Sequence, residues 1–76
     1  MFHMKHIKVE VRYNMRLNDV LKIIQLEEWL IIYTDYTIYQ GLKNNIPSLI
    51  IERNYEVTEI EISKVMSCFI ILIREN

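Results

Sequence analysis

Two histidines and one cysteine are the residues of this chain that are best suited to metal binding or nucleophilic catalysis. His3 and His6 are three positions apart, and the first carboxylate after them is Glu10. A metal site needs three or four ligands that converge, so this pair predicts no metal site. Cys68 stands among apolar residues, where a cysteine usually packs as a small hydrophobic side chain. We therefore expect no catalytic residue, no cofactor and no metal ion, and we expect that the protein is not an enzyme.

Carboxylates could support acid–base chemistry if a cleft held them together. Glu59 and Glu61 share one face of an expected strand, and Lys8 and Arg12 on the first strand offer cross-strand partners of opposite sign. This pattern is typical of a solvated strand face. Gly41 is the only glycine, which excludes a glycine-rich phosphate loop. The formal net charge of −1 argues against nucleic-acid binding.

Aromatic side chains around one expected hairpin are the strongest sign of a binding surface. Tyrosine and tryptophan are enriched in recognition hot spots because they bury large areas with little loss of entropy. The alternative is that these side chains fill the core. The candidate interface residues come from this hairpin and from the last strand, and they are Trp29, Ile31, Tyr33, Tyr36, Tyr39, Ile71 and Ile73.

Hydrophobic periodicity predicts the elements that would position these side chains. Residues 7–13 alternate apolar and polar side chains, which indicates a half-buried strand. Helical spacing predicts a helix over 17–24, and a second apolar stripe on the opposite side predicts a break at 25–27. A change of strand phase predicts a β-bulge near Thr58. The other expected elements are strands over 29–34, 36–42, 55–62 and 67–73 and a helix over 48–53 that ends at a left-handed Asn54.

These elements predict a single α+β domain over residues 1–76, with residues 1–6 as a flexible N-terminus. A small, mainly antiparallel sheet would carry two short helices in the order β-α-β-β-α-β-β. The strands at 29–33 and 68–73 are apolar on both sides, and such a strand needs cover on both faces of its sheet. Two short helices can cover one face only. We therefore expect an exposed apolar patch that serves as an interface.

The composition bears on the source and the compartment of the protein. The chain has 14 isoleucines, no alanine, one glycine and one proline, which indicates AT-rich coding and a low-GC bacterium or one of its phages. No apolar run approaches the roughly 18 residues of a membrane span. A single cysteine fits a reducing compartment. We expect a cytoplasmic protein without membrane contact.

The order of short motifs over residues 15–73 carries a resemblance. A leucine-rich helix leads into a hairpin that ends Ile38-Tyr39-Gln40-Gly41, followed by Ile46-Pro47 and a final apolar strand. This order resembles small, uncharacterised α+β proteins of prophages and mobile elements in low-GC Gram-positive bacteria. The first strand and the neutral segment 65–68 depart from that pattern. The resemblance implies a phage-linked setting and transfers no catalytic residue.

Two function classes follow from these expectations. The first is a non-catalytic binding protein that acts stoichiometrically on a host protein, for example a counter-defence inhibitor such as an anti-CRISPR. Its partner would be a host protein or a second copy of the chain, and not a nucleic acid. The second is a homo-oligomer that binds or sequesters a small nucleotide signal. A positive pocket with Arg12, Arg16 or Arg53 beside tyrosines would favour the second class, and a purely apolar patch would favour the first.

Overall fold

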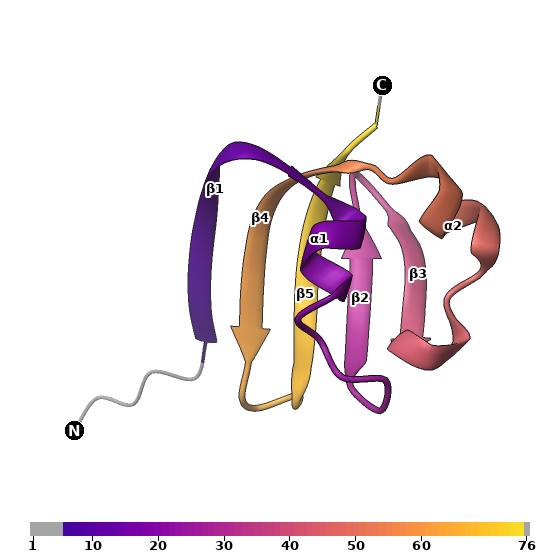
Figure 1. Ribbon diagram of the computed structural model, residues 1–76. Helices are drawn as coiled ribbons and strands as arrows, with labels where there is room; N and C mark the ends of the chain where they lie inside the picture. The colour runs from indigo at the N-terminus through magenta and orange to yellow at the C-terminus, as the bar shows by residue number, and fades with distance from the viewer. Residues whose placement is uncertain (1–5, 76) are drawn as a thin grey trace.

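The computed structural model describes the backbone of residues 6–75 and the side chains of residues 9, 11 and 14–75. This part folds as a small α+β domain, as the sequence predicts (Figure 1). The expected flexible terminus at 1–6 falls outside the described residues except for His6, which begins the first strand. The elements are β1 (His6–Arg16), α1 (Leu17–Leu21), β2 (Trp29–Tyr33), β3 (Thr37–Leu42), a 3-10 turn (Lys43–Asn45), α2 (Ser48–Arg53), β4 (Glu56–Ser63) and β5 (Cys68–Arg74).

The strands form one five-stranded sheet in the order β1-β4-β5-β2-β3. The neighbours β1–β4, β4–β5 and β2–β3 are antiparallel, and β2–β5 is the parallel pair. The last strand therefore lies in the middle of the sheet and joins the β1–β4 pair to the β2–β3 hairpin. Among the described residues, no helix is long and apolar enough to cross a membrane.

One face of the sheet packs against the two helices and forms the core. In Figure 1, α1 lies across the front of the sheet. Leu30, Ile32 and Ile71 of the central strands are 0% exposed, and α1 contributes Leu17 and Val20 to the same cluster. The core also contains Leu21, Ile24, Ile46, Ile50, Val57 and Ile73. Both helices thus contribute buried side chains to one core, with Ile50 as the buried residue of α2.

Local signals place the ends of α1 and the bend that follows it. The carboxylate of Asp19 accepts a hydrogen bond from the backbone N–H of Arg16 at 3.1 Å, which satisfies a donor at the start of the helix. The helix ends at Leu21, earlier than the predicted Ile24, and turns lead to β2. Ile24 stays in the core at 3% exposed. The predicted break after the first apolar stripe is confirmed.

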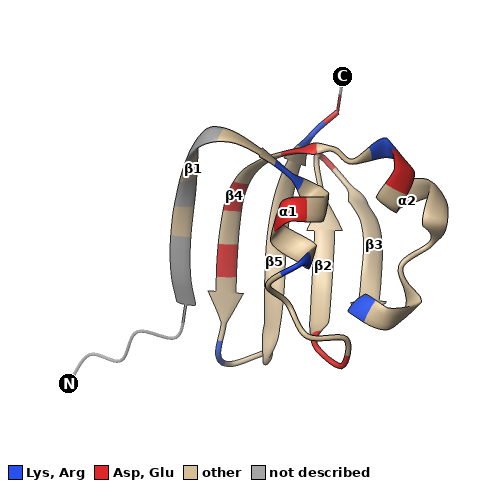
Figure 2. Cartoon of the chain, viewed as in Figure 1, with Lys and Arg blue, Asp and Glu red and all other residues tan. Residues whose placement is uncertain are grey.

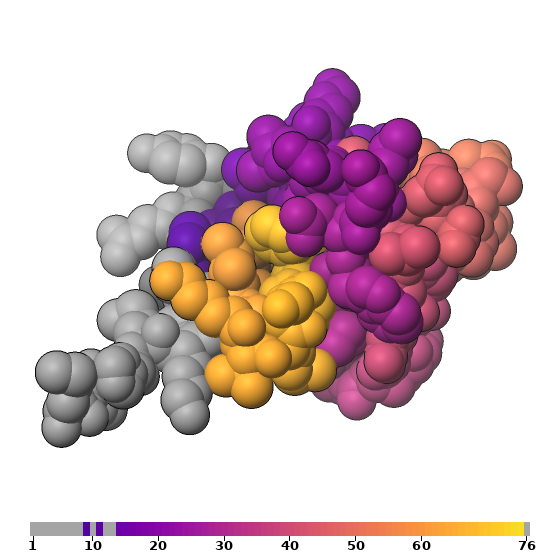
Figure 3. Space-filling model, turned by 90° about the horizontal axis from the view of Figure 1, so that it is seen from below, coloured from indigo at the N-terminus to yellow at the C-terminus, as the bar shows by residue number. Residues whose placement is uncertain are grey.

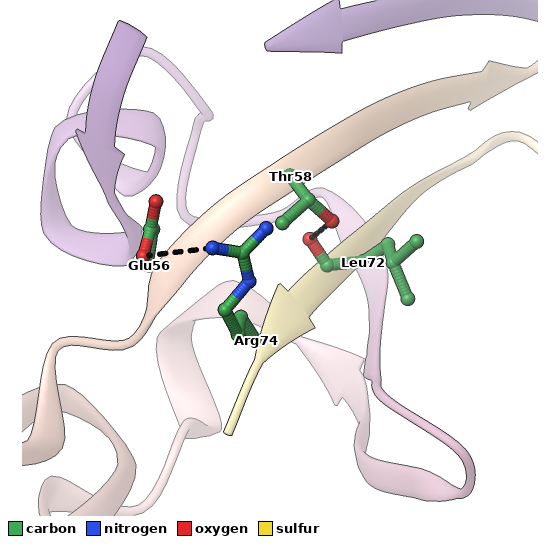
Figure 4. Close-up of polar contacts among 4 residues, drawn as sticks. All are labelled: Glu56, Thr58, Leu72 and Arg74. Carbon is green, nitrogen blue, oxygen red and sulfur yellow. Dashed lines mark hydrogen bonds and ion pairs between the residues drawn. The ribbon is translucent and has the colours of Figure 1, made fainter. Parts of the chain in front are cut away.

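The bulge and the left-handed residue also appear where the sequence predicts them. The register between β4 and β5 shifts between Val57 and Glu59, so Thr58 is the extra residue. Its hydroxyl donates a hydrogen bond to the carbonyl of Leu72 at 3.2 Å (Figure 4). Asn54 ends α2 with φ 45° and ψ 57°. Such a conformation is accessible to asparagine at lower cost than to most residues.

Candidate functional site

The face of the sheet opposite the helices carries a central apolar stripe. Residues alternate between the two faces along a strand, so the neighbours of the buried core residues in β2 and β5 project away from the helices. We call this side the open face, and its stripe consists of Trp29, Ile31, Tyr33, Ile70 and Leu72. Trp29 is 48% exposed, and the other four side chains are half-buried. In Figure 3, seen from below, the purple residues around α1 lie to one side of the orange and yellow residues of β4 and β5.

Two of the predicted interface residues do not lie on an exposed surface. Ile71 is 0% exposed and Ile73 is 3% exposed, both in the core under the helices. The prediction that they belong to the interface is wrong, because the helices cover the face on which they lie. Their neighbours Ile70 and Leu72 occupy the corresponding positions on the open face, although the sequence prediction did not name them.

The two remaining tyrosines of the hairpin are separated from the stripe. Tyr39 pairs with the buried Ile32 and packs against the core, and its hydroxyl donates to the carbonyl of Leu42 at 2.6 Å. Tyr36 is 59% exposed in the turn between β2 and β3. Its hydroxyl donates to the carboxylate of Glu75 at 3.4 Å, and the negative charge of Glu75 is the main cause that raises the pKa of Tyr36.

Acidic side chains border the stripe along β4. Glu59 pairs with Leu72 and Glu61 pairs with Ile70, so both carboxylates share the open face with the stripe. Figure 2 shows these positions in red on β4, beside the mostly tan strands β5 and β2. Near the upper end of the two strands, Arg74 lies 3.8 Å from the carboxylate of Glu56 (Figure 4). The β4 side of the stripe therefore carries two carboxylates, each of which has an interaction partner in the folded chain.

The described residues offer no assembled catalytic group. Cys68 is 6% exposed, and burial raises the pKa of its thiol, with a further contribution from the charge of Glu61. A raised pKa disfavours the nucleophilic thiolate. In the described part of the chain, no cluster of three histidine, cysteine or acidic side chains could hold a metal ion. His3 and the side chain of His6 lie outside that part.

A hollow lies at the end of the sheet where β1 and β5 end and β4 begins. It has a volume of about 210 Å³ and is lined by three arginines, one tyrosine and two glutamates, namely Arg16, Arg53, Arg74, Tyr55, Glu56 and Glu75. Arg16 and Arg53 are two of the arginines that the sequence analysis associates with a small-molecule pocket. The side chain of Arg12, the third, is outside the described residues.

No protein-family model, no curated protein and no solved structure matches the chain. The resemblance to prophage proteins therefore stays a prediction. The function has to be argued from the two surfaces described above, the open face and the arginine-lined hollow.

Proposed function

We propose that the protein is a non-catalytic binding domain that acts by stoichiometric contact with another protein through its open face. The observation that carries this proposal is the apolar stripe on the two central strands, which no described element covers. In a globular protein, an uncovered apolar surface of this kind marks an interaction site. The large ring of Trp29, 48% exposed, is of the type that anchors protein interfaces.

The size of the open face is compatible with a specific interface. Five strands at a spacing of about 4.8 Å, each with about six residues at about 3.3 Å, give a face of roughly 20 by 24 Å. That is about 480 Å² in projection, and protruding side chains increase the accessible area further. A standard interface buries about 800 Å² on each partner, so one partner can occupy the whole face.

Polar side chains of β4 border the apolar stripe on the open face. Glu59 and Glu61 lie on this face, and each already has an interaction partner in the folded chain. We favour a different protein as the occupant, because the AT-rich coding indicated by the composition fits a phage-linked setting in which the target is a host protein.

A host-directed role is the specific form of this proposal that the sequence supports. The isoleucine-rich, alanine-free composition indicates AT-rich coding, as in low-GC bacteria and their phages. A protein of a phage-linked setting that binds a cytoplasmic host protein, for example a component of a defence system, fits a small chain without catalytic groups. This role rests on analogy and on composition.

Site-specific photo-crosslinking tests the proposal in cells that carry the gene. A photoreactive amino acid replaces Ile31 on the open face and, as the control, Leu49 on α2, which is 60% exposed on another surface. We expect one discrete adduct with another protein from position 31 and none from position 49. The purified pair should then form a complex of fixed stoichiometry. Ile70→Glu should weaken this complex at least about tenfold, and Leu49→Glu should leave it unchanged.

Two results would contradict the proposal. If position 31 forms adducts only with the protein itself, and light scattering shows a dimer, the occupant is a second copy of the chain. If position 31 gives no more adduct than position 49 while circular dichroism shows that both variants are folded, the open face is not a docking surface.

A further inference from the structure

The arginine-lined hollow at the end of the sheet has a net positive lining, because three arginines and two glutamates surround it. Arg74 is paired with Glu56 at 3.8 Å, and Glu75 accepts a hydrogen bond from Tyr36. Within residues 14–75, no carboxylate forms an ion pair with the side chain of Arg16 or Arg53. Figure 2 shows the three arginines in blue at the start of α1, the end of α2 and the end of β5, in the upper part of the view.

Backbone contacts hold the two segments that carry Arg16 and Arg53 together. The N–H of Leu17, next to Arg16, donates to the carbonyl of Tyr55 at 2.8 Å. The N–H of Asn18 donates to the side-chain carbonyl of Asn54, next to Arg53, at 2.9 Å. These bonds join positions more than 30 residues apart in sequence. The two arginines are therefore brought to one hollow by the fold rather than by chance proximity of surface side chains.

An aromatic and apolar hollow adjoins the arginines. It has a volume of about 390 Å³ and shares Arg53, Tyr55 and Glu75 with the first hollow. Its remaining wall is formed by the β2–β3 turn, β3 and α2, and includes Tyr36, Ile38, Pro47 and Leu49. Because the two hollows share these residues, we treat them as one groove, in which Arg16 and Arg74 line only the first hollow and Tyr36 lines only the second. Ligand pockets commonly fall in this size range.

We infer that this groove binds a nucleoside monophosphate. Guanidinium groups bind phosphate oxygens through paired hydrogen bonds, which fits the end of the groove with Arg16 and Arg53. A nucleobase stacks on aromatic rings, which fits the wall with Tyr55 and Tyr36. Glu75 lies between the two ends and can accept hydrogen bonds from ribose hydroxyls or from a base amino group. The groove is lined by residues other than those of the stripe, so this inference does not depend on the proposed function.

Calorimetric titration with separate parts of the ligand tests the inference. The probes are the four ribonucleoside 5′-monophosphates, adenosine and inorganic phosphate, each at up to about 10 mM, which detects even weak binding. We expect at least one monophosphate to bind at least about tenfold more tightly than adenosine and phosphate alone. Arg53→Gln and Arg16→Gln should each weaken that binding about tenfold.

A matched control separates a site from general attraction between charges. Lys64→Gln removes the same charge in the turn between β4 and β5, at the other end of the sheet, and should leave binding unchanged. All three residues are exposed, so the variants should keep the thermal midpoint of the wild type. If Lys64→Gln weakens binding as much as Arg53→Gln, the groove is not the site. If no monophosphate binds, or if phosphate alone binds equally well, the inference is overturned.

Discussion

Ile70 and Ile71 offer a direct test of the two faces of the sheet. They are identical side chains, adjacent on β5, and the fold places Ile70 on the open face and Ile71 in the core. Ile71 is 0% exposed, and truncation of such an isoleucine to alanine costs about 2–5 kcal/mol. Ile70 is half-buried, so Ile70→Ala should cost only about 1 kcal/mol in the isolated chain.

These losses are large relative to the stability of a domain of this size, which is about 3–5 kcal/mol. With about 4 kcal/mol in the wild type, a loss of about 3 kcal/mol leaves roughly one Ile71→Ala molecule in six unfolded at 25 °C. The smaller loss in Ile70→Ala leaves fewer than about 1% unfolded. The free energy of unfolding should therefore distinguish the two variants clearly.

Urea denaturation followed by far-ultraviolet circular dichroism provides the measurement. With a slope of about 1 kcal/mol/M, the midpoint should fall by about 3 M for Ile71→Ala and by about 1 M for Ile70→Ala, with unchanged slopes. Equal shifts, or a larger shift for Ile70→Ala, would refute the assignment of the faces. The experiment is run at two protein concentrations, because self-association through the open face would make the midpoint depend on concentration.

Three further outcomes test local features, with stability measured by urea denaturation. A Cβ at Gly41 (φ 154°) would lie 2.7 Å from the hydroxyl oxygen of Tyr39, so Gly41→Ala should cost about 2 kcal/mol. The loss caused by Gly41→Ala should be smaller when the chain also carries Tyr39→Phe, which lacks the hydroxyl. An equal loss in both chains would contradict the contact. Asn54→Ala should cost about 2 kcal/mol and Asn54→Gly about 1 kcal/mol. Both variants lose the hydrogen bond with Asn18, and only alanine adds strain in the left-handed conformation. Equal losses would show that the left-handed conformation adds no strain. Since burial raises the pKa of Cys68, the unfolded chain releases the thiol proton first. Stability should thus fall as pH rises through the range in which an ordinary thiol ionises, more steeply than in Cys68→Ala, and parallel pH profiles would contradict this linkage.

Features that depend on neighbours in sequence could be predicted from the sequence. The bulge at Thr58 follows from apolar side chains that change strand phase within a few residues. The break after α1 follows from two apolar stripes that one straight helix would place on opposite sides. The left-handed Asn54 follows from a residue type that tolerates this conformation directly after a helix. Each of these signals is local, so no knowledge of the sheet is needed to interpret it.

Which face of the sheet the helices leave open could not be predicted, because it depends on contacts between distant segments. From Phe69 to Ile73 every residue of β5 is apolar, so the strand itself does not indicate which side meets the helices. The side is set by the parallel pairing with β2 and by the position of α1. For this reason the sequence predicts Ile71 and Ile73 as interface residues, whereas Ile70 and Leu72 lie on the open face.

The groove illustrates the same distinction between residue type and placement. Arg16 and Arg53 are among the residues that the sequence predicts for a small-molecule pocket. Hydrogen bonds join the start of α1 to the end of α2. These segments are far apart in sequence, and no local pattern predicts that they touch. The neighbouring aromatic wall depends on the same tertiary contacts.

The central position of β5 has a consequence for how the protein comes into being. Synthesis proceeds from the N-terminus, so the strand that joins the two halves of the sheet is the last of the five to be made. Until then, β4 and β2 each have an edge with unpaired backbone groups and apolar side chains. Chains at this stage are prone to aggregate or to pair with the wrong strand. Yield in the cell should therefore depend on how quickly β5 inserts, and the pairing between β2 and β5 becomes a natural target for improving expression.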